Sequence, residues 1–166
     1  MTVIREIKIE DSEEYLRLCK ILDEETKFRP YDPGERNFSD EEQKHKIADV
    51  LNSTNSIILV AEENGELVGY ISATGSNLNR LKHSTKIGIA IKLSCCGKGI
   101  GKELFYALEN WARKNKLKRL ELTVMTDNIG ALILYKKMGF EIEGIKRKSL
   151  FINGEFADDY YMSKFI

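Results

Sequence analysis

Residues 94–104 read SCCGKGIGKEL, with glycines at positions 97, 99 and 101 and lysines at 98 and 102. An alternating apolar segment, TKIGIAIKL (85–93), precedes this stretch, and a helical pattern with Leu104, Leu108 and Trp111 on one face follows it. Glycines allow a backbone to approach an anion closely, and the first N–H groups of a helix have no partner within the helix. The stretch therefore predicts an anion-binding turn between a strand and a helix.

The spacing of these glycines excludes two common phosphate-binding motifs. The dinucleotide fingerprint requires G-x-G-x-x-G after the first strand, whereas this chain has G-x-G-x-G. The P-loop requires G-x-x-x-x-G-K-[ST], but Glu103 follows Gly101-Lys102 and Cys96 occupies the position of the first glycine. Two alternatives stay open at this point: a glycine-rich turn with no ligand, and a nucleotide-binding protein of another fold.

The rest of the chain predicts one α/β domain over residues 1–166, with the element order β-α-α-β-β-β-α-β-α-β-β. Asn64-Gly65 and Asn153-Gly154 are hairpin signals, and Ser39 with Glu42 forms a capping box. The strand–helix–strand segment near 86–125 predicts a parallel crossover. We therefore expect a mixed sheet, mostly antiparallel, with helices on both faces.

Composition narrows the class of protein. The 166 residues contain 26 Lys and Arg and 26 Asp and Glu, a balance that argues against non-specific binding to nucleic acid or to a membrane surface. The charged start of the chain does not resemble a signal peptide, and no apolar run is long enough for a transmembrane helix. Three cysteines, two of them adjacent, form a poor disulfide framework, so a cytoplasmic location is expected.

The segment CGKGIGKEL resembles the signature [QR]-x-x-G-x-[GA] of the GNAT (GCN5-related N-acetyltransferase) superfamily, with Cys96 in place of Gln or Arg. The preceding IGIAIKL is similar to the strand that pairs with the pantetheine arm in that superfamily. MTDNIGALILYKKMGFEIEG (125–144) and NGEFADDYYMSK (153–164) resemble its downstream block and its closing strand. The resemblance covers about residues 56–165.

This resemblance implies a central, splayed pair of parallel strands and an acetyl-CoA-dependent N-acetyltransferase that needs no metal. The acceptor would be a primary amine of a small molecule or of a protein or peptide. The alternative is a CoA-binding sensor or regulatory module without catalysis. Cys96 and the lack of an obvious general base motivate that alternative.

The resemblance also implies roles for individual residues. Tyr135 would protonate the departing thiolate, and Asn128, on the same helical face, would bond the cofactor. The remaining cofactor residues would be Ile89, Ala90, Ile91, Gly97, Lys98, Gly99, Ile100, Gly101 and Lys102. The general base is predicted as His83, with Glu62, Glu63, Asp158 and Asp159 as other candidates.

The segment 23–38 contains both prolines of the chain and predicts a long loop that could act as a lid or a substrate wall. Its candidates for substrate specificity are Asp23, Glu24, Glu25, Arg29, Tyr31 and Arg36, of which we select Glu24, Glu25 and Tyr31 as substrate residues. Acids there would attract a cationic amine, and the alternative is a solvated run of charges at the end of a helix. The apolar end YYMSKFI (160–166) suggests a homodimer in which sheets pair between subunits.

Overall fold

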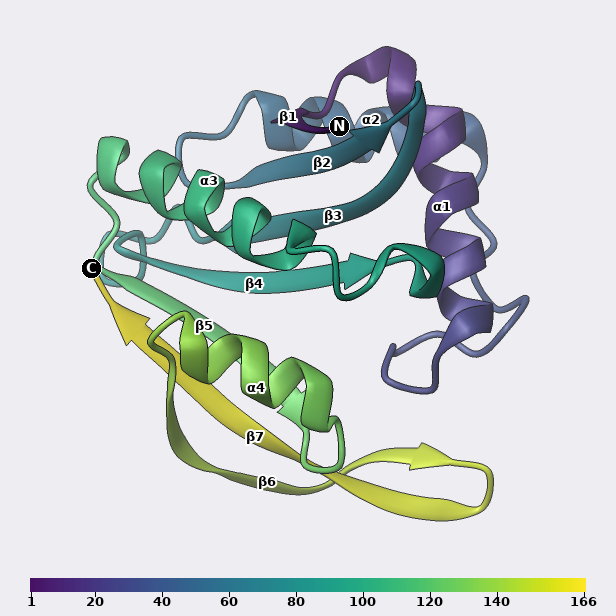
Figure 1. Cartoon of the computed structure of the whole chain (residues 1–166). Coiled ribbons are helices and arrows are strands. Elements are labelled where there is room, and N and C mark those ends of the chain that lie inside the picture. Colours follow the sequence, from purple (N-terminus) through teal and green to yellow (C-terminus); the bar gives the residue numbers. More distant parts are fainter.

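The computed structural model describes residues 1–166 and contains one seven-stranded mixed sheet, ordered β1-β2-β3-β4-β5-β7-β6 (Figure 1). All neighbouring strands are antiparallel except β4 and β5. The predicted element order and mixed sheet are therefore confirmed. The strands are β1 (Thr2–Glu6), β2 (Ile57–Glu63), β3 (Glu66–Gly75), β4 (Ser84–Ile91), β5 (Arg119–Met125), β6 (Glu141–Ile152) and β7 (Glu155–Phe165).

Helices cover both faces of the sheet, as predicted (Figure 1). One face carries α1 (Ser12–Glu25) and α2 (Asp40–Leu51), and the other carries α3 (Ile100–Lys114) and α4 (Ile129–Lys137). Two short 3₁₀ helices, Ile9–Asp11 and Leu93–Cys95, add to this order. The larger core lies between the sheet and α3 with α4, and a smaller core lies under α1 and α2. No helix has both the length and the apolar character needed to cross a membrane.

Local turn chemistry explains how the strands and helices are joined. Both residues of Asn64-Gly65 have positive φ angles, 52° and 83°, and Asn153-Gly154 has 51° and 82°, as two-residue hairpin turns require. At the start of α2, the Ser39 side chain accepts from the Glu42 N–H while the Glu42 carboxylate accepts from the Ser39 N–H. Both hairpins and the capping box are therefore confirmed.

The first helix extends further than its apolar pattern predicts. We expected the loop to start at Asp23, but α1 continues to Glu25. The apolar periodicity ends at Leu22 because the next inward-facing residue is Asp23, which is buried in an ion-paired cluster. The predicted loop boundary was therefore wrong by three residues, and the connection to α2 spans 26–39.

The C-terminal segment forms an interior strand. β7 pairs with β5 on one side and with β6 on the other, so both of its edges are occupied within the chain. The edges of the sheet are β1 and β6. The expectation that residues 160–166 pair a sheet between subunits was therefore wrong.

The two parallel strands separate soon after they begin. β4 and β5 pair only between Ser84–Lys86 and Arg119–Glu121, although β4 continues to Ile91 and β5 to Met125. Figure 1 shows the strands diverging toward the end of β4 that leads into the glycine turn. The sheet is thus split by a wedge, and the edge of β4 that faces it has no strand partner beyond Lys86.

Candidate active site between the splayed strands

The glycine turn presents a row of unpaired backbone donors at one end of the wedge. Gly97 and Gly99 have φ angles of +79° and +89°, and a Cβ added at either would meet nothing within 4 Å. The N–H groups of residues 97–101 donate to no backbone or side-chain acceptor; the first paired amides are those of Lys102 and Glu103, which donate to the Gly99 carbonyl. Five consecutive free N–H groups at the start of a 15-residue helix form a binding site for an anionic group such as a phosphate.

The third glycine has a different role. Gly101 lies in the first turn of α3, and a Cβ at this position would come within 2.8 Å of Leu134 Cδ2 on α4. It therefore allows α3 and α4 to approach each other closely. Of the two lysines, Lys98 is 3.6 Å from Glu63 and half-exposed, while Lys102 forms no ion pair.

Cys96 does not present a reactive thiol at this turn. Its thiol lies within reach of the carbonyls of Ile91 and Lys92, at 3.8 and 3.5 Å. Burial raises the pKa of the Cys96 thiol, so the group stays protonated at neutral pH. Neighbouring Cys95 is buried in the larger core.

The wedge-facing edge of β4 supplies further donors. The Lys92 N–H donates to Val68 on β3, and N–H groups alternate in direction along a strand. Alternation therefore directs the N–H groups of Ile87, Ile89 and Ile91 away from β3; that of Ile87 faces Glu121, the last paired residue of β5, and those of Ile89 and Ile91 face the wedge. Of the three expected cofactor residues on β4, Ile89 and Ile91 therefore direct their N–H groups toward the wedge, whereas the backbone N–H of Ala90 faces β3.

Tyr135 approaches the wedge from α4. Its ring packs edge-on against Phe105, 5.8 Å between centroids, and also contacts Phe140. Its hydroxyl makes no hydrogen bond within the chain. Every fully buried side-chain oxygen has a partner, so the Tyr135 oxygen is not fully buried and can contact a ligand. Burial, with a smaller effect from the nearby Tyr70 phenol, raises the pKa of Tyr135 well above its usual value. Tyr135 therefore stays protonated and can donate.

Asn128 lies at the start of α4. Its side-chain oxygen accepts from the Ala131 N–H at 3.3 Å, which caps the helix. The side-chain NH₂ makes no hydrogen bond within the chain, which leaves it able to bond a ligand.

The opposite face of the wedge carries a buried charged cluster, which we call the arginine cluster: Asp23 on α1, Arg29 and Arg36 in the following loop, and Tyr70 on β3. Arg29 and Arg36 donate to the two oxygens of Asp23 at 2.7 and 2.6 Å, and Arg29 also donates to the Tyr70 hydroxyl at 3.0 Å. Burial alone would raise the pKa of the Asp23 carboxyl, but hydrogen bonds from Arg36 and Arg29 bring it below its usual value. Tyr70 is the direct register partner of Ala90, which places the cluster one strand from the β4 edge.

The three expected substrate residues lie near this cluster but outside it. Glu25, at the end of α1, accepts from the Leu93 N–H at 2.9 Å and so holds the turn that follows β4. Tyr31 packs against Phe38 with the Arg36 guanidinium 4.1 Å from its ring centre. Glu24 is exposed and makes no hydrogen bond. None of the three is brought into the wedge by a contact within the chain.

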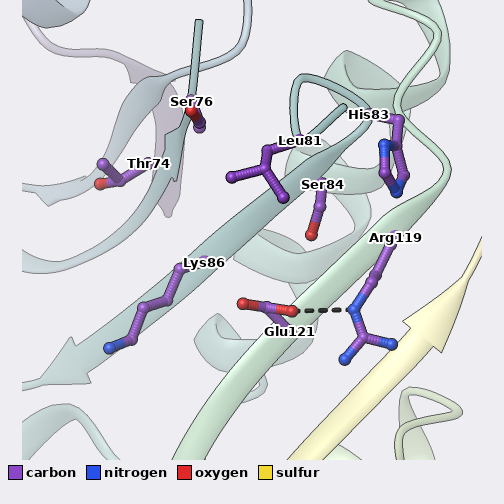
Figure 2. A pocket seen from close by; sticks show the side chains of 9 residues that line it. Thr74, Ser76, Leu81, His83, Ser84, Lys86, Arg119 and Glu121 are labelled. Carbon is purple, nitrogen blue, oxygen red and sulfur yellow. Dashed lines mark hydrogen bonds and ion pairs between the residues drawn. The ribbon is translucent and has the colours of Figure 1, made fainter. Parts of the chain in front are cut away.

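His83 lies at the far end of β4. It lines a cavity of about 420 Å³ together with Lys86, Arg119 and Glu121 (Figure 2). Ala90 is seven positions after His83, about 23 Å along an extended strand. The predicted base is therefore not brought together with Tyr135 and the donors of β4.

Of the other base candidates, Asp159 has the placement nearest to the wedge. It is buried, it pairs in register with Met125 at the end of β5, and its carboxylate makes no ion pair. Glu62 is bound to Arg5 and Glu63 to Thr2, both at the β1 side of the sheet, and Asp158 accepts from the Lys148 N–H. No group of three His, Cys, Asp or Glu side chains could hold a metal ion.

Sequence reasoning named Asp23, Arg29 and Arg36 only as specificity candidates, and it missed their burial in one cluster with Tyr70. The acids of the segment 23–38 suggested a site for a cation, but the Asp23 carboxylate is already ion-paired with Arg29 and Arg36. The sequence did offer one indication of this cluster, which is the pair Arg29 and Arg36 shortly after a helix that ends in acids. Tyr70 lies in an ordinary strand pattern and gave no indication of its contact with Arg29.

Comparison with known proteins places this geometry in context. The chain is 36% identical over 110 residues to the L-amino acid N-acetyltransferase AaaT of Escherichia coli, covering 64% of this chain and 66% of that protein. It is 32% identical over 109 residues to the N-alpha-acetyltransferase RimI of Mycobacterium tuberculosis, covering 63% of each. The chain thus spans about two thirds of the length of these curated relatives.

Solved structures share the whole fold. A GNAT-family acetyltransferase from Streptococcus pneumoniae superposes with a TM-score of 0.97 at 32% identity, covering 100% of both chains. A GNAT superfamily phosphinothricin acetyltransferase from Sinorhizobium meliloti, in complex with AcCoA, has a TM-score of 0.86 at 18% identity, covering 99% of this chain and 88% of that one.

The family model of these enzymes matches residues 17–140, which include the glycine turn, the splayed strands and Tyr135. The resemblance carried by CGKGIGKEL is thereby confirmed, and the chain belongs to the Acetyltransferase (GNAT) family.

Proposed function

We propose that this protein transfers the acetyl group of acetyl-CoA to a primary amine. The observation that carries this proposal is the continuity between five unpaired N–H groups at residues 97–101 and the unpaired edge of β4, which together border a wedge in the sheet. One end suits a pyrophosphate and the other suits a narrow, extended chain. Membership of an acetyltransferase family supports the same assignment.

The residues present fit the cofactor. Gly97 and Gly99 adopt left-handed backbone angles with no neighbouring atoms where a Cβ would be, so a phosphate can approach the turn. Lys102 and the half-exposed Lys98 add positive charge. Asn128 would bond the pantetheine arm through its free NH₂ group, and Ala131 leaves room beside it.

Acetyl-CoA would supply an activated acetyl group as a thioester. The outward N–H groups of Ile89 and Ile91 would hydrogen-bond the carbonyl oxygen and stabilise the negative charge that develops on it. Tyr135, kept protonated by burial, would donate its proton toward the departing sulfur. The Tyr135 ring is held by packing against Phe105 and Phe140, and Ile89 and Ile91 are held by the pairing of β4 with β3.

The acceptor amine must lose a proton to attack. We propose Asp159 as the group that orients the amine and accepts this proton, directly or through water. Its support is its buried position opposite Met125, beside the end of β5. His83 stays the alternative from the sequence, and acting over about 23 Å it would need a chain of water molecules.

The first test is thermal unfolding with and without acetyl-CoA, using ATP and NAD as controls. Ligand at 100 times its dissociation constant stabilises a protein by about 2.7 kcal/mol, or roughly 5–10 °C for a chain of this size. Stabilisation by acetyl-CoA alone, followed by amine-dependent release of free thiol, would support the proposal. Absence of stabilisation would overturn it, and binding without thiol release for any amine would favour a CoA sensor.

Assembly and location complete the proposal. We propose a homodimer formed through exposed apolar side chains of the C-terminal sheet, such as Ile145 and Phe165, rather than by strand pairing. Light scattering after size exclusion would detect a mass of twice 19.0 kDa. We also propose that the protein acts in the cytoplasm, because all three cysteines are free thiols.

A further inference from the structure

The arginine cluster contains more positive than negative charge. The side chain of Asp23 is 1% exposed, and those of Arg29 and Arg36 are 9% and 11% exposed. One carboxylate therefore faces two guanidinium groups in a nearly dry environment. Removing a charge from water costs several kcal/mol unless a partner compensates it, so the second arginine leaves this cluster one negative charge short.

The hydrogen bonds show where the missing charge would bind. Arg29 uses Nε on Asp23 and Nη1 on Tyr70, while Arg36 uses Nε and Nη2 on Asp23. Nη2 of Arg29 and Nη1 of Arg36 donate to nothing within the chain. Neither nitrogen is fully buried, because every fully buried side-chain nitrogen has a partner. Two donors are thus held in place and accessible.

The position of the cluster relates these donors to the reaction. Tyr70 lies opposite Ala90 in the β3–β4 ladder, and its phenol is close enough to Tyr135 to raise the pKa of that residue. The loop that carries both arginines is fastened across the wedge, since Lys27 pairs with Asp127 at 2.8 Å. The cluster therefore borders the side of the wedge opposite α4, from which an acceptor would enter.

Ion pairing within the chain does not account for this composition. One arginine neutralises Asp23; the second is met by aromatic rings, with the Arg36 guanidinium 4.1 Å from the Tyr31 ring centre, but by no second carboxylate. A carboxylate matches the donor geometry of guanidinium groups. On β7, one strand beyond the β5 side of the wedge, the buried Asp159 carboxylate pairs in register with Met125 and makes no ion pair, which suits it to an ammonium group.

We propose that Arg29 and Arg36 recognise a carboxylate on the acceptor, so that the substrates are amines of the amino-acid type rather than simple alkylamines or polyamines. This inference rests on the proposed acetyl transfer and names its substrate class. The arginines position the acceptor and take no part in proton transfer.

The test compares three acceptors that share one side chain: a free amino acid, its amide and the corresponding decarboxylated amine. Thiol release from acetyl-CoA gives kcat and KM for each. The amino acid should have a KM about 10- to 100-fold below that of the other two, the range expected for a hydrogen bond to a charged group. Arg36→Gln should remove most of this preference through KM, because it leaves Asp23 paired one-to-one with Arg29.

Two further variants separate recognition from folding. Arg113→Gln removes an exposed arginine on α3 and should keep the full preference. Arg36→Lys keeps the positive charge but loses the paired N–H donors of the guanidinium group, so part of the preference for the free amino acid should remain. A readout independent of turnover is stabilisation by the N-acetylated amino acid in the presence of CoA, which should exceed that by its amide in the wild type and not in Arg36→Gln.

The outcomes distinguish the two proposals. Equal KM values for all three acceptors, with normal acetyl-CoA binding and turnover, would overturn the carboxylate inference alone. No stabilisation by acetyl-CoA and no thiol release with any amine would overturn the acetyltransferase proposal itself.

Discussion

The Lys27 ammonium lies 2.8 Å from the Asp127 carboxylate, one hundred residues further along the chain. Lys27 follows α1, whose last residue holds the turn after β4, and Asp127 follows β5. The pair therefore joins the ends of the two splayed strands across the open side of the wedge. Both side chains are about half exposed, so the contribution of the pair to the free energy of unfolding is small.

We expect Lys27→Ala to speed the release of CoA while changing the melting temperature little, because the pair holds a loop and not the core. The measurement is the dissociation rate of CoA at 0.05 and 1 M salt, since salt screens exposed charges. The difference from wild type should shrink at high salt. Lys20→Ala, on the exposed side of α1, is the control. An unchanged dissociation rate of CoA in Lys27→Ala would contradict the idea that the Lys27–Asp127 pair slows its release.

Gly99→Ala should weaken acetyl-CoA binding, because its φ of +89° costs an L-residue about 1–2 kcal/mol and the added methyl group faces the predicted phosphate. Titration calorimetry gives the affinity, and thermal unfolding gives the stability. Gly154→Ala is a matched control, since Gly154 has a φ of +82° and equally open surroundings in the β6–β7 turn. It should lose similar stability and no affinity. Equal affinities in the two variants would argue against a phosphate at the turn.

Tyr135→Phe should lower kcat by about 10²-fold or more and leave acetyl-CoA affinity unchanged, because the ring packing is kept and only the proton donor is lost. Steady-state kinetics with thiol detection measures this split. Tyr106→Phe, on the exposed side of α3, provides the control. If Tyr135→Phe retains wild-type kcat, another group or water protonates the sulfur.

The general base can be assigned with two variants. Asp159→Asn should lower kcat/KM for the amine by about 10²-fold or more at neutral pH, while His83→Gln should have little effect because of its distance from Ala90. At high pH, where more of the amine is already neutral, the Asp159→Asn defect should become smaller. The reverse ranking of the two variants would restore His83 as the base.

Acid should selectively weaken the C-terminal sheet. Hydrogen bonds from Arg119 and Ser163 lower the pKa of Glu143 from 4.5 to about 2. Because the folded-state pKa is depressed, this stabilisation is present above pH 4.5 and is lost as the pH falls toward 2. Glu143→Gln should therefore be less stable than wild type at pH 7, with the difference shrinking in acid; denaturant unfolding across this range measures it. Glu141→Gln, an exposed neighbour, should show no such dependence.

Local chemistry accounts for the parts of the fold that the sequence predicted. Asn64-Gly65 and Asn153-Gly154 determine their turns because both residues must adopt positive φ angles. The alternating TKIGIAIKL and the glycines after it identify the strand–turn–helix unit, and so the cofactor side of the site.

The acceptor side depends on contacts between distant segments. From the sequence, Asp23 is typical of a solvated charge at the end of a helix, whereas in the structure it is buried between Arg29 and Arg36. Tyr70 reaches Arg29 over 41 residues, and the register that sets it against Ala90 is a property of the assembled sheet. Side-chain type and spacing along the chain do not reveal such contacts between distant segments. The positive charge of the arginine cluster could therefore not be predicted.

The three-residue seam between β4 and β5 means that the sheet is two plates joined along a short margin. A ligand lying in the wedge would take the place of the missing strand contacts and add to the core that joins the two plates under α3 and α4. Part of the rigidity of this molecule would then belong to a compound that is consumed in every turnover. Departure of the product would leave the two plates joined by this margin and by the core under α3 and α4, with the wedge open to the next pair of substrates.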